Sequence, residues 1–226
     1  MDLFCFVIVL LHVSLATTAD FSQVFKWQDE LDYEWPSEKS RTHALKVGTF
    51  KPSNFEPRYM AVSRTRIFLS LFRTVGISVT LVSLPTSSAS SAPPKLTPFP
   101  SWDMHGYGDC NKIERARGLE MDSVGRLWVL DSGSEKCDVK LWIFDLFNND
   151  RTKLVHRFTI QKWMHDLVLD ETPNGYFAYI VRWEEEHIVV FSLERNQSWN
   201  VYTAGIKAFS IAVSPKSRWT ENLLAD

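Results

Sequence analysis

Short runs of apolar residues, many of them β-branched or aromatic, recur along most of the chain and are separated by turn-forming residues. Runs of this kind are typical of β-strands. They lie at residues 25–27, 31–36, 67–72, 78–82, 119–122, 126–131, 140–145, 167–170, 176–181, 187–191 and 209–215. A short helix is expected over residues 37–45, with Ser37 as its N-cap. The pattern therefore predicts an all-β protein.

The predicted strands recur as a unit of one strand, a turn containing Gly or Pro, an aromatic strand and a third strand. Successive units begin near Leu119, Leu167 and Ile211, which places them 48 and 44 residues apart. This spacing is in the range of a four-stranded propeller blade. The repeat favours a β-propeller, and a non-repeating β-sandwich is the alternative.

The first nineteen residues have a different composition from the rest. An almost unbroken apolar run extends from Leu3 to Leu15 and ends in the small residues of segment 16–19. This arrangement is typical of a secretory signal peptide, and the run is too short to span a bilayer comfortably. We expect residues 1–19 to be removed and residues 20–226 to form one extracellular domain. A buried N-terminal strand or helix is the alternative.

Composition supports a globular domain without an electrostatic preference for polyanions. Of 226 residues, 45% are hydrophobic and 23% are charged, which is enough apolar material for a sizeable core. The formal net charge is −2, so neither nucleic acid nor an anionic membrane is an expected partner.

The cysteines and one sequon fit an extracellular location. Cys5 lies within the expected signal peptide, which leaves Cys110 and Cys137. An even number of cysteines in an oxidising compartment predicts a disulfide, with two buried thiols as the alternative. Asn196 begins an Asn-Gln-Ser glycosylation sequon between two predicted strands, where a turn would expose it.

Searching the chain for catalytic motifs returns little. The sequence contains no G-x-S-x-G, H-E-x-x-H, C-x-x-C, P-loop or G-x-G-x-x-G motif. Hydrolase, metalloprotease, redox and nucleotide chemistry therefore lose support. No cofactor is expected, and no metal, because Asp166 alone is not a calcium site.

Polar residues just before the inner strands are the best candidates for ligand binding, because propellers bind ligands at the central channel. These residues are Arg117, His165 and Asp166. A histidine beside a carboxylate can transfer protons or bind an amine. The alternative is that Arg117 and Asp166 hold backbone groups or pair with each other.

Four aromatic residues form a second candidate ligand site. Trp128, Trp142, Tyr179 and Trp183 could enclose an organic cation, or they could fill the space between blades. Asp131, Asp145 and Arg73 are expected to have structural roles.

Several longer motifs resemble the yellow/major royal jelly protein family of arthropods. They are Gly125–Asp131, Phe25–Ser37, Pro94–Trp102, the Gly108–Cys110 segment, Cys137 with Lys140–Leu146, and Asn196–Val201. The resemblance implies that Cys110 and Cys137 form the family's first disulfide. The sequence departs from many members at Val124, where they carry a further cysteine.

The resemblance also implies a partial six-bladed propeller, because family members have chains nearly twice as long. We expect roughly three to four blades here, incomplete at the C-terminal side, with self-association able to cover an open edge. A partial gene product and a short isoform are further alternatives.

The function that the resemblance implies is that of a secreted, non-enzymatic protein. Its expected role is in pigmentation, melanisation or cuticle, and its expected ligands are small biogenic amines or catechol-type molecules. One alternative is a dopachrome-converting enzyme of melanin synthesis. Another, resting on shared architecture alone, is a calcium-dependent lactonase-type hydrolase.

Overall fold

A computed structural model describes residue 27 and residues 31–86, 94–159 and 163–214. The expected signal peptide lies outside these ranges. Residues 25 and 26 of the strand predicted at residues 25–27 also lie outside them. The described part is an all-β structure of three four-stranded antiparallel sheets, as predicted. None of the helices in this part is long and apolar enough to cross a membrane.

Each sheet is formed by four strands that follow one another in the sequence. The first sheet contains β1 (Pro57–Val62), β2 (Arg66–Leu71), β3 (Leu81–Pro85) and β4 (Thr97–Pro98). The second contains β5 (Ala116–Met121), β6 (Arg126–Asp131), β7 (Val139–Asp145) and β8 (Arg151–Phe158). The third contains β9 (Met164–Thr172), β10 (Gly175–Arg182), β11 (His187–Ser192) and β12 (Gln197–Tyr202).

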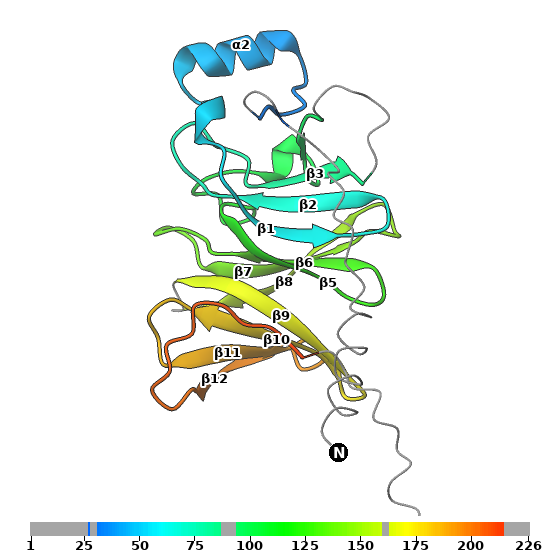
Figure 1. The fold of residues 1–226 in the computed structure, drawn as a ribbon, viewed down its shortest axis with the longest axis vertical. Coiled ribbons are helices and arrows are strands. Elements are labelled where there is room, and N and C mark those ends of the chain that lie inside the picture. The colour runs from blue at the N-terminus through cyan, green and yellow to red at the C-terminus, as the bar shows by residue number, and fades with distance from the viewer. Residues whose placement is uncertain (1–26, 28–30, 87–93, 160–162, 215–226) are drawn as a thin grey trace, which may run out of the picture.

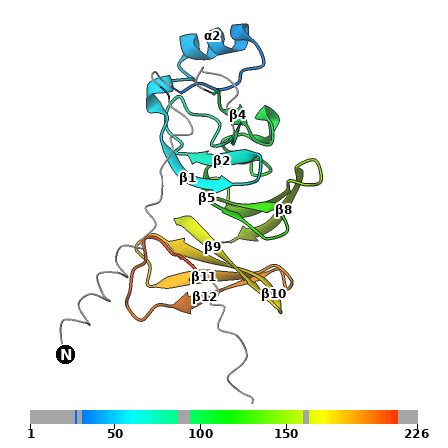
Figure 2. The same ribbon diagram turned by 45° about the vertical axis from the view of Figure 1, so that its right-hand side comes forward.

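The three sheets stack face to face, and their first strands β1, β5 and β9 lie one below another (Figures 1 and 2). One apolar core separates the first and second sheets and includes Phe68, Phe99 and Phe144. A second core separates the second and third sheets and includes Trp128 and Phe191. Since both faces of the second sheet are covered, β7 is buried along almost its entire length.

The outer face of the first sheet is covered by the N-terminal segment. Helix α2 (Glu38–Val47) begins where the sequence predicts, and the backbone N–H of Ser40 donates to the Ser37 hydroxyl at 3.1 Å. It ends at Gly48, whose φ of 75° is the left-handed conformation that favours glycine. Two short 3₁₀ helices, η1 (Pro52–Asn54) and η2 (Trp102–Met104), flank the sheet.

Several predicted strands differ from the structure. The segment 31–36 contributes a single bridge, Tyr33 to Leu96, and the strand predicted at 78–82 begins at Leu81. Strand β8 was not predicted, because its polar residues face solvent at the edge of the sheet. The strand predicted from residue 209 is absent through residue 214. A strand needs a neighbour for its ladder of hydrogen bonds, and the described chain provides none there.

The repeat nevertheless holds. Units beginning near Leu119 and Leu167 are complete sheets, and the four-stranded first sheet precedes them. Three successive sheets of the same topology are incompatible with a non-repeating two-sheet sandwich.

The close approach of β5 and β9 depends on Gly118. A Cβ atom at this position would lie 2.8 Å from the backbone nitrogen of Leu167 and 3.2 Å from Asp166 Cα. We expect Gly118→Ala to lower the free energy of unfolding by about 1–3 kcal/mol, because backbone cannot move aside as a flexible side chain can. Urea denaturation measures this change.

Gly106→Ala is the matched control for this substitution. Its Cβ would meet the end of the flexible Lys112 side chain, at 2.9 Å from Cδ, so a small effect is expected. Equal stability of both variants and the wild type would show that β5 and β9 are not in such close contact.

Candidate ligand-binding site at the inner strands

The first strand of every sheet carries a bulge at the same place, immediately after the strand begins. The pairing register shifts between Pro57 and Tyr59 in β1, between Ala116 and Leu119 in β5, and opposite His165 in β9. Arg58, Arg117 and His165 are each the second residue of their strand. Bulges redirect side chains and are common beside functional sites.

We call Arg58, Arg117, His165 and Asp166 the inner-strand site. The structure thus brings the three residues predicted from the sequence to one end of the adjacent strands β5 and β9. Arg58, on β1, was missed, because its strand lies outside the repeats that the sequence analysis aligned.

His165 is buried and contacts the segment that follows the third sheet. Its two ring nitrogens lie 3.4 Å from the Trp163 carbonyl oxygen and 2.5 Å from the Phe209 carbonyl oxygen. Its ring packs against those of Trp183 and Phe209, with centroids 6.0 and 5.3 Å away, and these two rings also contact each other. The site therefore has one aromatic wall.

Asp166 binds the same segment, which follows the third sheet, by accepting hydrogen bonds from a side chain and from the backbone. One carboxylate oxygen accepts from the Leu167 N–H at 2.9 Å. The other accepts from the Ser210 hydroxyl at 2.6 Å and the Ile211 N–H at 3.3 Å. The interpretation that Asp166 satisfies backbone groups is confirmed. An ion pair between Asp166 and Arg117 is not among the contacts of the described residues.

Arg117 is half-buried at the boundary between the first and second sheets. Its guanidinium lies 5.0 Å from the centre of the Phe72 ring, and that of Arg58 lies 4.7 Å from the same ring. Burial lowers the pKa of Arg117 below its usual value. Burial also raises the pKa of the neighbouring Tyr59 to about 12, so this phenol is neutral at physiological pH.

Two further arginines extend this surface. The guanidinium groups of Arg73 and Arg115 lie 4.8 and 5.5 Å from the centre of the Tyr107 ring. Arg73 also donates to the carbonyl oxygens of Ser78 and Glu114, at 3.0 and 3.1 Å, which confirms its structural role.

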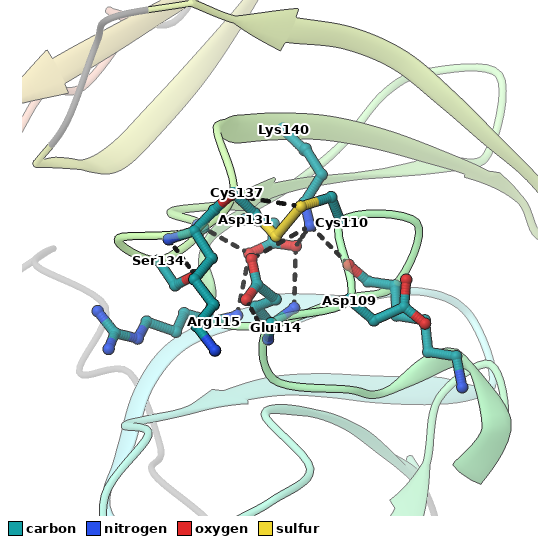
Figure 3. A network of polar contacts seen from close by, with 12 residues as sticks. Asp109, Cys110, Glu114, Arg115, Asp131, Ser134, Cys137 and Lys140 are labelled. Carbon is teal, nitrogen blue, oxygen red and sulfur yellow. Dashed lines mark hydrogen bonds and ion pairs between the residues drawn. A yellow bond between two sulfur atoms is a disulfide. The ribbon is translucent and has the colours of Figure 1, made fainter.

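Behind these arginines lies a buried ionic cluster that consists of Glu114, Asp131 and Lys140 (Figure 3). All three side chains are fully buried. Lys140 Nζ lies 3.5 Å from Glu114 Oε2 and 3.2 Å from Asp131 Oδ2, and it donates to the Lys112 carbonyl oxygen at 2.7 Å. This cluster could not be predicted from the sequence, because a lysine at the start of a strand is usually solvated.

The buried ionic cluster positions the segment that leads into β5. Asp131 accepts from the backbone N–H groups of Glu114 at 3.0 Å, Arg115 at 2.9 Å and Gly133 at 3.0 Å. Asp131 therefore makes turn hydrogen bonds as predicted, and it also fixes the backbone that carries Arg115. The Arg115 side chain extends away from the cluster (Figure 3).

A disulfide encloses this region. Cys110 and Cys137 are bonded, which confirms the pairing expected from the sequence and excludes the two-thiol alternative. The bond links the segment before β5 to the segment before β7. Arg157 on β8 donates to the Cys110 carbonyl oxygen at 2.9 Å, which ties the same segment to the edge of the second sheet.

The aromatic cage is not formed. Trp128 lies fully buried in the core between the second and third sheets, whereas Trp142 lies in the core between the first and second. Their side chains point to opposite faces because β6 and β7 pair Trp128 with Ile143 and Val129 with Trp142. Trp128 and Trp142 thus fill the space between sheets, as the alternative predicted, whereas Trp183 is about half exposed and packs against His165.

The sequon lies at the turn between β11 and β12, where Asn196 is exposed. Its side-chain oxygen lies 3.2 Å from Nδ1 of His156, and the Ser198 hydroxyl lies 3.1 Å from Nε2 of the same ring. Exposure at a turn is the context that the sequence predicted. Within the described ranges, no group of three or more His, Cys, Asp or Glu residues is arranged to hold a metal ion.

Stacked four-stranded antiparallel sheets with their first strands side by side are the arrangement found in propeller-type proteins. Comparison with known proteins agrees with this class. The family model described as Major royal jelly protein matches residues 116–214.

The curated relatives include the Protein yellow of several fruit flies. That of Drosophila guanche is 28% identical over 214 residues, covering 84% of this chain and 37% of the relative. That of Drosophila melanogaster is 27% identical over 194 residues, covering 77% of this chain and 35% of the relative. These matches confirm the resemblance to the yellow/major royal jelly protein family, and the chain spans little more than a third of the length of the relatives it matches.

Proposed function

We propose that this protein is a secreted, yellow-like protein of pigmentation or cuticle that binds a small aromatic molecule without converting it. The observation that carries the proposal is the alignment of bulges in β1, β5 and β9. They place Arg58, Arg117 and His165 at one end of three adjacent strands. Such a convergence of redirected polar side chains is typical of a binding site.

The ligand class follows from the surroundings of these side chains. Phe72 and the Trp183 and Phe209 rings provide apolar surface, while Tyr59 and Arg117 provide hydrogen-bonding groups. Catechol-type molecules and biogenic amines combine an aromatic ring with a few polar groups, and this site matches that combination.

The location and architecture are part of the same proposal. We propose that residues 1–19 direct secretion, that Asn196 is glycosylated, and that the three sheets are consecutive blades of a six-bladed propeller. The disulfide supports an oxidising compartment. Self-association or the remainder of a longer protein would cover the open face of the last sheet.

Thermal unfolding of the full chain, expressed through a secretory route, tests binding. A ligand that binds only the native state raises the melting temperature, and at 100 times Kd it contributes about 2.7 kcal/mol. We expect 4-methylcatechol or dopamine to raise the midpoint measured by Trp fluorescence. Unchanged midpoints with every catechol and amine would overturn the proposal.

Two activity assays distinguish binding from catalysis. Dopachrome absorbance should decay at the same rate with and without the protein; faster decay would instead support the dopachrome-converting alternative. Lactone hydrolysis that disappears on adding a chelator would support the calcium-dependent alternative, and we expect no hydrolysis.

A further inference from the structure

Four guanidinium groups gather around two aromatic rings where the first and second sheets meet. Arg58 and Arg117 lie against Phe72, and Arg73 and Arg115 lie against Tyr107. The two groups lie close together, since Arg115 interacts electrostatically with both Arg73 and Arg117. We call these four residues the arginine cluster. Burial is the main cause that lowers the pKa of Arg117 and Arg73, and repulsion from the neighbouring Arg58 and Arg115 lowers it further.

Few carboxylates compensate this charge. Glu56 pairs with Arg58 at 2.5 Å, and both are well exposed. Glu114 lies near Arg73, but its carboxylate is directed to Lys140 and the Gly108 N–H. Asp166 already accepts three hydrogen bonds.

Two of the guanidinium groups keep unused donors. Arg117 makes no side-chain hydrogen bond or ion pair with any described residue; its contact is the face of Phe72. The Nε atom of Arg115 is buried and has no hydrogen-bond partner among the described residues. A buried guanidinium nitrogen without an acceptor is costly, and an anionic ligand that accepts a hydrogen bond from it would remove that cost.

We propose that the arginine cluster is an anion subsite that binds the carboxylate of a small aromatic ligand, with Arg117 as its main contact. The inference deepens the proposed function, on which it rests, by assigning the charge of the ligand. Planar guanidinium groups bind carboxylates through paired hydrogen bonds. The neighbouring rings would contact the aromatic part, and a catechol with a protonated amine would bind through its ring but more weakly than one with a carboxylate.

Three catechols that share one ring and differ in side-chain charge test the assignment. They are 3,4-dihydroxyphenylacetate (anionic), 4-methylcatechol (neutral) and dopamine (cationic). Isothermal titration of the full chain should give the lowest Kd for the acetate, about tenfold below that of the neutral compound, since a charge-assisted hydrogen bond contributes more than a neutral one. Added salt should weaken binding of the acetate and leave 4-methylcatechol unaffected.

Arg117→Gln should abolish the preference for the acetate, so that the acetate and 4-methylcatechol bind with similar Kd. Arg117→Lys should retain part of the preference, because the charge remains and the paired geometry is lost. Arg64→Gln is the control, because Arg64 is exposed in the turn between β1 and β2, at the other end of the strands.

The possible outcomes separate the two proposals. If no catechol binds, the proposed function fails. If catechols bind but the acetate is not preferred over dopamine and 4-methylcatechol, the anion subsite is wrong while the proposed function stands. The ranking for the wild-type protein decides this even if Arg117→Gln does not fold.

Discussion

Lys140→Met should lower the free energy of unfolding by about 3–5 kcal/mol, the largest effect that we expect of a single substitution in this protein. Methionine keeps the length of the side chain but removes the ammonium that lies between Glu114 and Asp131. Both carboxylates are fully buried, so neither can recover its solvation by turning to water. Domains of this size are stable by only about 5–15 kcal/mol, and the variant should therefore have a much lower urea midpoint.

Lys153→Met provides a matched control, because Lys153 is exposed on the neighbouring strand β8. An exposed lysine away from special features should change stability by less than about 0.5 kcal/mol. A Lys140→Met variant as stable as this control would show that the buried ionic cluster contributes little. The triple variant Glu114→Gln, Asp131→Asn and Lys140→Met should lose less than Lys140→Met alone, since no unpaired charge is left behind.

Replacing both cysteines of the disulfide by serine should cost about 3–4 kcal/mol, the second largest effect. Cys110 and Cys137 are 27 residues apart, and the chain-entropy model assigns a loop of this length a stabilisation of that size. We expect removal of the disulfide also to disturb the arginine cluster. The segment that contains Cys110 leads directly into the residues before β5, and these include Arg115. Thermal unfolding with and without reductant measures the effect on the wild type.

The serine variant itself supplies the control, because reductant should not change its melting temperature. If reductant destabilised the variant as much as the wild type, the effect would not come from the Cys110–Cys137 bond. If the disulfide contributes only to stability, the affinity of the folded protein for 3,4-dihydroxyphenylacetate should be unchanged in the serine variant. If it also positions Arg115 through the buried ionic cluster, that affinity should fall.

The strands were largely predictable from the sequence, for a local reason. Segments 126–131, 140–145, 176–181 and 187–191 combine β-branched and aromatic residues with flanking turns, and each is a strand. Helix α2 was predictable because its cap, Ser37, acts within one turn of chain. The repeat followed from the same local patterns. Strand β8 escaped prediction because an edge strand with polar residues has no distinct apolar pattern.

The candidate site was predictable only in part. Arg117, His165 and Asp166 could be named because they precede apolar runs at corresponding places in the repeat. Their partners could not: Arg58 and Phe72 belong to the first sheet, and Tyr107 lies in the connection between the first and second sheets. The bulges that redirect Arg58, Arg117 and His165 depend on how two strands pair, which no single run of residues encodes.

By itself, the sequence determined that this is an all-β protein of repeated four-stranded units with a disulfide between Cys110 and Cys137. Local periodicity and cysteine count carry that information. Only the tertiary structure decided that Lys140 is buried between two carboxylates and that four arginines converge where two sheets meet. These are properties of neighbours far apart in the chain, because the burial and charge around a side chain depend on which strands pack against it.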